Sequence, residues 1–351
     1  MPDPQVQARS GRRIRKICEA AIDARALRLA ILEELAKVVG FDAYAWPLTD
    51  PQTEIGSAPL ADVPCLPELP QLIRLKYLTP VNRWTTMLSS PVATLREATG
   101  GDLSLSLLWR DLLSRYDIGD VASMVFRDRF GCWSFLDLWR TGVSARFTGP
   151  EVEFLAAISE PVTTALRRCQ ADTFIARPPR DEPHAGPVVL LLSGELQVRA
   201  QTPDTEDYLR MIVPPPQDRA PIPASAYNVA AQLLATEAGI DSHPAATRLH
   251  LSDGLWITLR AARIGNADDA DIAVTIEETT PAQRVPVFAR AFALTTRETE
   301  LLDHLSTGVA TTDVAARMFL SQHTVQDHLK SIFAKTSTHS RSTLLSRALG
   351  T

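Results

Sequence analysis

Apolar residues recur at helical spacing through the C-terminal part of the chain, and turn signals divide them into short helices. The first helix is predicted to begin after Thr295, where Glu298 completes a capping box, and to end at Gly308. A second helix is predicted from about Thr312 to Phe319. The residues expected on the buried faces of these helices are Leu301, Leu302, Leu305, Val314, Ala315 and Met318.

The next helix has one apolar and one polar face. It is predicted over residues 322–336 with Ser321 as its N-cap, and its apolar stripe is Val325, Leu329 and Ile332. The residues expected to point away from this stripe are Gln326, Asp327 and Lys330. A helix, a tight turn and a second helix with a polar outer face describe a helix-turn-helix, whose second helix can enter the major groove of DNA.

At these residues the sequence resembles the C-terminal DNA-binding domain of LuxR-type (NarL-type) transcriptional regulators. The matching positions are Leu294-Thr295, Arg297-Glu298, Gly308, Val314-Ala315, Ser321, Thr324-Val325, His328, Ile332, Lys335 and Ser340-Arg341. The resemblance implies an all-α domain of four helices over residues 287–351 that binds double-stranded DNA as a homodimer. Candidate dimer surfaces are the final helix, with Leu344, Leu345 and Ala348, and a long helix after Pro150.

The resemblance also implies roles for single residues. The residues expected to contact bases are Gln326, Asp327 and Lys330, with His323 at the leading end of the helix. The residues expected to contact phosphates are Gln322, Thr324, Lys335 and Arg341. Two interpretations of Asp327 remain open: it accepts a hydrogen bond from a cytosine, or it pairs with Lys330 and touches no base.

Several positions depart from the family pattern. Ala310 and Thr312 stand where Ser and Lys are usual, and Gln326 stands where Lys usually follows the Thr-Val pair. Ser337 replaces a usual Gly, which predicts a costlier helix end because Gly adopts the required conformation without strain. These changes remove phosphate-seeking charge, so a protein-interaction regulator with a degenerate helix-turn-helix is the alternative function.

Residues 19–172 show the element order of an α+β domain. The predicted elements are a helix over 27–38, a strand over 41–48, a Pro-rich irregular stretch, a helix over 104–116, strands over 121–127 and 131–140, and a helix from Pro150 that Pro161 should kink or break. This order resembles a GAF domain, which implies a ligand pocket beside the sheet. The candidate pocket residues are Tyr77, Trp84, Trp133, Phe135 and Trp139, with a role in the core as the alternative.

The strand around residues 133–139 is apolar at both alternating sets of positions, so both of its faces should be buried. Asp137 lies within it, and a buried carboxylate needs a partner. It could accept a hydrogen bond from a ligand or pair with a nearby arginine, and pairing is the favoured interpretation.

Residues 186–280 resemble a PAS domain in the order of their elements. The predicted elements are strands over 188–192 and 196–200, a helix capped by Thr202, a helix over 224–238, and strands over 247–251, 255–263 and 271–277 with a turn at Asp253-Gly254. His243 and His250 could be haem ligands, but Leu249 and Leu251 take the buried parity, so solvated histidines are favoured. Linkers are predicted over 177–186 and 280–286.

Charge and cysteine usage limit the class of protein. The net charge is −5; from Val285 onward seven basic side chains oppose five acidic ones, giving +2 there and −7 before it. A mildly basic tail on an acidic body suits a DNA-binding module attached to a sensor. Cys18, Cys65, Cys132 and Cys169 are scattered singly, which favours reduced thiols over a disulfide or metal site.

Taken together, these patterns predict a cytoplasmic α+β regulator of transcription without a cofactor. No apolar run approaches the ~20 residues of a membrane span. The chain also has no nucleophile elbow, Walker A loop or zinc-protease motif, so an enzyme is not expected. It lacks the acidic cluster and βα repeat of a phosphorylated receiver domain. The expected partners are DNA, a second copy of the chain, a small-molecule effector and RNA polymerase.

Overall fold

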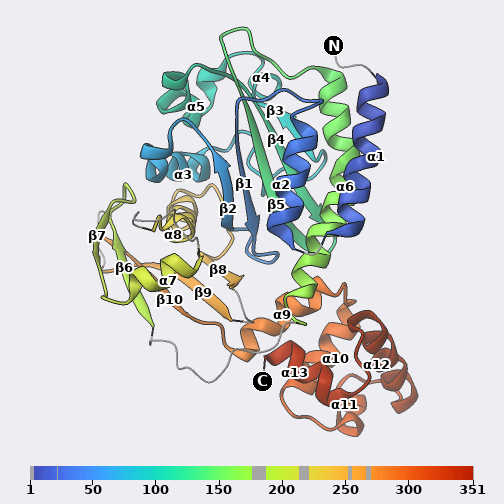
Figure 1. Ribbon diagram of the computed structural model, residues 1–351. Coiled ribbons are helices and arrows are strands. Elements are labelled where there is room, and N and C mark those ends of the chain that lie inside the picture. The colour runs from blue at the N-terminus through green and yellow to red at the C-terminus, as the bar shows by residue number, and fades with distance from the viewer. Residues whose placement is uncertain are drawn as a thin grey trace.

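The structure, a computed structural model, describes residues 4–21, 23–175, 187–212, 221–251, 255–265 and 270–350 of the 351-residue chain. It contains two five-stranded antiparallel sheets, followed by a group of helices at the C-terminal end (Figure 1). The predicted α+β class is confirmed. The linker predicted over 177–186 and the turn at Asp253-Gly254 lie outside the described residues.

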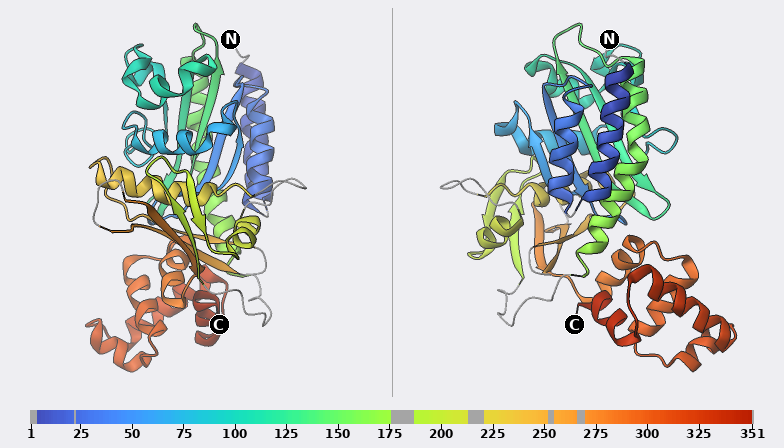
Figure 2. Two further views of the ribbon diagram at one scale, coloured as in Figure 1. Left: turned by 90° about the vertical axis from the view of Figure 1, so that its left-hand side faces the viewer. Right: turned by 45° about the vertical axis from the view of Figure 1, so that its right-hand side comes forward.

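The first sheet belongs to the N-terminal part of the chain, residues 4–175, and has the strand order β2-β1-β5-β4-β3. Its strands are β1 (Ala43–Thr49), β2 (Gly56–Asp62), β3 (Val92–Thr94), β4 (Ile118–Asp128) and β5 (Gly131–Thr141). Helices α1 (Pro4–Ala20), α2 (Ala24–Leu35) and α6 (Gly149–Asp172) cover one face of the sheet (Figures 1 and 2). On the other face lie α3 (Leu69–Leu78), α4 (Leu95–Ala98), α5 (Leu107–Asp111) and short 3-10 helices at Leu66–Glu68, Leu103–Leu105 and Leu113–Tyr116.

The Pro-rich stretch predicted to be irregular contains regular elements, namely β2 and α3. Pro47 lies inside β1, between β2 and β5, at a point where the pairing with β2 shifts register, so no ladder hydrogen bond is lost there. Pro70 stands in the first turn of α3, where a missing N–H is tolerated. Both prolines are therefore compatible with regular secondary structure, although the high proline content predicted an irregular stretch.

Two further helix predictions in this part are wrong. Helix α6 continues through Pro161 without a break, because its buried face packs against the sheet and against α1 over many residues. The helix predicted over 104–116 is instead divided into short pieces at Leu112, whose φ and ψ of −136° and −64° are not helical. Helix α1, which precedes the predicted domain start at residue 19, packs Ile14 and Cys18 into the same core as α6.

The second sheet belongs to the middle part, residues 187–278, and has the order β7-β6-β10-β9-β8. Its elements are β6 (Val188–Leu192), β7 (Val198–Gln201), α7 (Thr205–Ile212), α8 (Ala224–Glu237), β8 (Ala246–His250), β9 (Trp256–Arg263) and β10 (Ile272–Glu278). Numbered from its own first strand, this order is the same as that of the first sheet. The predicted strands of this part are thus confirmed within a residue or two.

Helix α8 joins the two parts, because it packs on α3 and β2 of the N-terminal part as well as on β9. One hydrophobic cluster therefore contains Tyr77, Trp84 and Phe135 together with the core of the second sheet. Charged groups cross the same boundary: the Arg83 Nη2 atom lies 2.7 Å from Asp241 Oδ2, and both side chains are buried. The second sheet consequently shares a hydrophobic cluster with one face of the first sheet, whereas the other face of the first sheet packs in a different cluster with α1, α2 and α6.

The C-terminal part consists of α9 (Pro281–Ala291), α10 (Thr296–Ser306), α11 (Thr311–Arg317), α12 (Gln322–Thr336) and α13 (Arg341–Leu349). The linker predicted over 280–286 is wrong, because these residues open α9. Thr280 and Gln283 form a capping box around Pro281, a start signal that the sequence did contain. Phe174, just after α6, packs against Trp256 and Phe288 and so connects all three parts.

Candidate functional site

The helices of the C-terminal part have the N-caps and the buried faces that the sequence predicted. Thr295 and Glu298 form the capping box of α10, and the Ser321 hydroxyl accepts a hydrogen bond from the backbone N–H of Thr324 at 3.1 Å. The buried residues are Leu301, Leu302, Leu305, Val314, Ala315, Met318, Val325, Leu329 and Ile332, as expected. A helix-turn-helix is therefore present, with α11 and α12 as its two helices.

The outer face of α12 is open to solvent. Side-chain exposures are 84% for His323 and 73% for Lys330, and Gln322, Gln326 and Asp327 are also exposed. The views in Figures 1 and 2 place α12 at the outer edge of the molecule, away from both sheets. In this arrangement the polar face is accessible to a large partner such as a DNA duplex.

Within that face, Asp327 is surrounded by basic groups of its own helix. Its Oδ1 atom lies 3.3 Å from Lys330 Nζ, and its Oδ2 atom lies 3.6 Å from His323 Nε2. Three of the four residues expected to contact bases, His323, Asp327 and Lys330, are therefore connected by ion pairs. The fourth, Gln326, is exposed beside them. Both interpretations of Asp327 stay possible on DNA, but in the free protein it pairs with Lys330.

The two basic residues expected to contact phosphates make bonds inside the domain. Lys335 Nζ lies 2.6 Å from Glu298 Oε2, and Arg341 Nη2 donates to the carbonyl oxygen of Val309 at 2.9 Å. Burial alone would raise the pKa of Glu298, but hydrogen bonds from Lys335, Ser331 and the capping box lower it to about 2. The other two, Gln322 and Thr324, lie in the first turn of α12, where Thr324 bonds to the Ser321 cap.

Two non-glycine residues beside the recognition helix have left-handed backbone conformations. Phe319 in the turn before α12 has φ +55° and is 94% exposed, and Ser337, the C-cap of α12, has φ +50°. The left-handed conformation of Ser337 agrees with the costlier helix end that the sequence predicted. Phe319 was named from the sequence only as the approximate end of a helix, and neither its exposure nor its backbone conformation was predicted.

We expect Ser337→Gly to raise the free energy of unfolding by about 0.5–1 kcal/mol, because glycine adopts the left-handed conformation without a Cβ clash. Urea unfolding followed by circular dichroism measures the change. Ser340→Gly is the matched control: Ser340 caps α13 with φ −145°, so glycine there should bring no gain. Equal effects of the two substitutions would contradict the role given to Ser337.

The geometry of the C-terminal part can be compared with that of known families. The family model described as bacterial regulatory proteins, luxR family, matches residues 293–348. These residues form a LuxR-type helix-turn-helix domain. No curated protein matches the chain. DNA binding and regulation of transcription are what the LuxR-type domain indicates for this protein.

Outside the LuxR-type domain, the aromatic residues of the candidate pocket do not all meet. Tyr77, Phe135 and Trp139 line a cavity of about 260 Å³ between α3 and the first sheet, closed on one side by Ala224 and Asn228 of α8. Trp84 stacks on Phe135 with ring centroids 4.3 Å apart but lies behind it. Trp133 lies elsewhere, in the core formed with α6. The structure therefore unites three of the five candidates around one cavity.

Asp137 is buried and paired, as favoured, but its partner is a lysine and not an arginine. Its Oδ2 atom lies 2.6 Å from Lys76 Nζ, and the Ser123 hydroxyl donates to Oδ1 at 2.7 Å. Lys76 and Asp137 both line the 260 Å³ cavity, which gives it one polar wall among apolar ones. Lys76 was not among the predicted site residues because helix α3, which carries it, was not predicted. Pro70, in the first turn of α3, was the sequence feature that could have indicated this helix.

The expectation of solvated histidines is wrong, since His243 and His250 are both half-buried. His243 Nδ1 lies 2.6 Å from Asp241 Oδ1, and the His250 ring packs edge-on against Trp256. Leu249 and Leu251 are buried, as their parity predicted. Within the described ranges, no group of three or more His, Cys, Asp or Glu side chains could hold a metal ion.

We expect His243 to make stability decline above neutral pH. Its hydrogen bond to Asp241 raises its pKa, so the stabilisation is complete below the unfolded-state pKa of about 6.5 and is lost as pH rises through the higher folded-state pKa. Urea unfolding at pH 6 and pH 8.5 should show a larger loss for the unmodified protein than for His243→Gln. The same loss in both proteins would contradict this role.

Other observations bear on partners and on the thiols. Of the predicted dimer surface on α13, Leu344 and Ala348 are fully buried and Leu345 is half-buried. The apolar residues of α6 are likewise covered by α1 and the sheet. No helix in the described part of the chain is long and apolar enough to cross a membrane. The four cysteines are free and buried, and burial raises the pKa of Cys132 to about 12.

Proposed function

We propose that this protein is a sequence-specific DNA-binding regulator of transcription that acts as a homodimer. The single observation that carries the proposal is the exposed polar face of α12 in a domain that matches the luxR family. In this proposal Gln326, with Lys330 and His323, reads bases in the major groove. Gln322 and Thr324, at the start of the helix, approach the phosphates, and RNA polymerase is a further partner.

The same proposal makes the two sheet-containing parts sensor domains. Residues 19–172 would form a GAF-like domain and residues 186–280 a PAS-like domain, with residues 287–351 as the DNA-binding domain. The shared strand order of the two sheets and the 260 Å³ cavity beside the first one support this. A small molecule bound there would act through α8, which closes the cavity and also packs on the second sheet.

The alternative is an interaction protein whose helix-turn-helix does not bind DNA. Its support is electrostatic: Lys335 pairs with Glu298, Lys330 with Asp327 and Arg297 with Glu300, so fewer basic groups of the domain are free to contact phosphates. Binding of the full-length protein to sheared genomic DNA, measured between 50 and 200 mM salt, separates the two functions. A binding constant that falls steeply with salt supports DNA binding, and no binding at 50 mM supports the alternative.

The proposed dimer could use only part of the two predicted surfaces, because most apolar residues of α13 and α6 are buried within one chain, whereas Leu345 is half-buried. Two linked copies gain affinity by reading two half-sites about one helical turn apart. Sedimentation of the protein with and without its selected DNA site is the corresponding measurement. A monomer in both cases would contradict this part of the proposal.

We expect Asp327→Asn to strengthen binding to every DNA sequence, because it removes a carboxylate that repels the backbone and releases Lys330. The slope of log K against log salt should become steeper by about one, as one more phosphate is neutralised. Glu300→Gln is the control, since that acid lies on α10 and pairs with Arg297. Weaker binding to the selected site alone would show instead that Asp327 reads a cytosine.

A further inference from the structure

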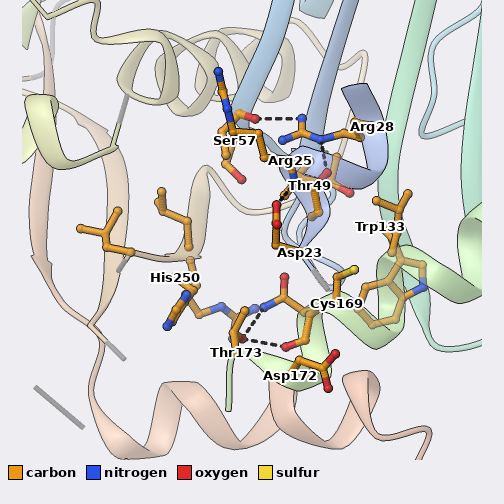
Figure 3. A pocket seen from close by; sticks show the side chains of 18 residues that line it. Asp23, Arg25, Arg28, Thr49, Ser57, Trp133, Cys169, Asp172, Thr173 and His250 are labelled. Carbon is orange, nitrogen blue, oxygen red and sulfur yellow. Dashed lines mark hydrogen bonds between the residues drawn. The ribbon is translucent and has the colours of Figure 1, made fainter. Parts of the chain in front are cut away.

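A second and larger cavity lies where the N-terminal part meets the middle part. Its volume is about 640 Å³, within the range of small-molecule sites, and it shares no lining residue with the cavity at Tyr77. Figure 3 shows its walls, which come from the start of α2, from β1 and β2, from the end of α6 and from β8. Its apolar surface is formed by Leu48, Trp133, Leu166, Leu249 and Leu251.

The most unusual group in this cavity is Arg28, which is only 2% exposed. Its Nε atom donates to Ala24 O at 3.0 Å, and its Nη1 atom donates to Trp46 O and, at 3.0 Å, to Ala58 O. No carboxylate among the described residues lies within ion-pair distance of it, and Nη2 has no acceptor there. Burial lowers its pKa to about 9. A buried cation without a counter-charge is costly unless an anion joins it.

The carboxylates near the cavity form no direct ion pair with Arg28. Asp23 caps α2 by accepting from the N–H groups of Arg25 and Ala26, and Asp50 is engaged by Arg248, with Nε and Oδ2 2.7 Å apart. Asp172 lines the cavity but is exposed at the far end of α6. Arg28 is therefore a buried charge in this cavity that has no direct ion-pair partner, although the nearby Asp23 carboxylate acts on it through space.

A polar group lies next to Arg28 on the same side of the cavity. Ser57 is buried, and its hydroxyl has no hydrogen-bond partner in the part of the chain that the structure describes. Figure 3 shows Ser57 adjacent to the Arg28 guanidinium, opposite Trp133 and His250. The backbone turns here because Ala58 has φ +43°, which directs its carbonyl oxygen at Arg28. A guanidinium and a hydroxyl thus lie at one end of a cavity that apolar and polar side chains line together.

We propose that this cavity binds a small carboxylic acid with an apolar body. Its carboxylate would join Arg28 Nη2 and the Ser57 hydroxyl, and its body would lie along Leu48, Trp133 and Leu249. The planar guanidinium matches a carboxylate in geometry and in charge. The apolar walls exclude a highly polar ligand such as a nucleotide.

Occupancy of the cavity would also affect the joint to the LuxR-type domain, an extension that rests on the proposed function. Cys169 and Thr173 of α6 line the cavity, and Phe174 follows directly. The Phe174 ring lies 4.7 Å from that of Trp256 and 5.3 Å from that of Phe288 in α9. A ligand that contacts α2, α6 and β8 would therefore limit the movement of the end of α6, which packs through Phe174 against α9 of the C-terminal part.

Three probes with one apolar body and different head groups test the proposal: octanoate, 1-octanol and octyl phosphate. Calorimetric titration of the full-length protein should show octanoate binding at least tenfold more tightly than 1-octanol, and more tightly than octyl phosphate. Arg28→Gln should reduce octanoate to the affinity of 1-octanol. Equal binding of octanoate and 1-octanol by the unmodified protein would overturn the proposal, and tighter binding of octyl phosphate would overturn the choice of a carboxylate.

A second variant keeps the test valid if Arg28→Gln does not fold. Gln170 is half-buried on α6 and lines the cavity, so Gln170→Trp should fill it and abolish octanoate binding while leaving the circular dichroism spectrum unchanged. Arg110→Gln, on an exposed arginine of α5, is the control and should bind normally. Undiminished octanoate binding by Gln170→Trp would place the ligand elsewhere. These titrations involve no DNA, so their failure is distinct from failure of the proposed function.

Discussion

Replacing Arg83 by methionine is expected to lower the free energy of unfolding by about 3–5 kcal/mol, because it leaves Asp241 buried without its cation. Arg83 is fully buried and donates from Nε and Nη2 to Asp241, from Nη2 to Gln232 and from Nη1 to the Tyr77 carbonyl. These contacts join the N-terminal part to the middle part. Their loss should therefore destabilise both parts together.

Urea unfolding followed by far-UV circular dichroism and by tryptophan fluorescence measures this effect. Arg110→Met is the matched control, since Arg110 pairs with Asp111 at the surface and should contribute less than about 1 kcal/mol. Asp241→Asn should also be strongly destabilising, because it leaves the fully buried Arg83 guanidinium without its carboxylate. A loss below about 1 kcal/mol for Arg83→Met would show that the buried pair does not hold the two parts together.

Replacing Gln326 by alanine is expected to weaken binding to the selected DNA site by about 1–3 kcal/mol and to change binding to random DNA little. Gln326 directly follows Val325, which is buried in the domain core, and its own side chain is exposed on the opposite face of α12. A glutamine amide can bond an adenine at two positions. Its loss should therefore remove discrimination between bases without changing charge.

Gln322→Ala is the matched control for this effect. Gln322 is also an exposed glutamine of α12, but it stands in the first turn beside the Ser321 cap, where phosphates are expected. Its replacement should weaken selected and random DNA alike, since phosphate contacts carry no sequence information. If Gln326→Ala also weakens both alike, Gln326 does not read bases.

The LuxR-type domain was predictable because its signals are local. Each helix start is set by a cap within a few residues, such as Thr295 with Glu298 or Ser321 with Thr324, and its buried residues follow helical spacing. Helix α9 had equally local signals at Thr280 and Gln283, but Pro286 within it suggested a linker. The packing of Val285, Val287 and Phe288 outweighs the cost of that proline.

Contacts between distant segments could not be predicted in the same way. Arg83 and Asp241 carry no pattern that pairs them, and Arg28 in the sequence is one arginine on an ordinary helix. The candidate pocket was only partly right for the same reason. Strict alternation along a strand places Trp133 and Phe135 on the same face. The pairing of β4 with β5 shifts register next to Arg127, and Trp133 and Phe135 consequently belong to different hydrophobic clusters.

Selection from a pool of random-sequence duplexes tests most directly the claim that this protein reads DNA through α12. The full-length protein is incubated with the pool at moderate salt, and the bound duplexes are amplified and sequenced over several rounds. We predict enrichment of one sequence with two half-sites about one helical turn apart, and loss of that enrichment with Gln326→Ala. A pool that stays random after binding to the folded protein would contradict the claim.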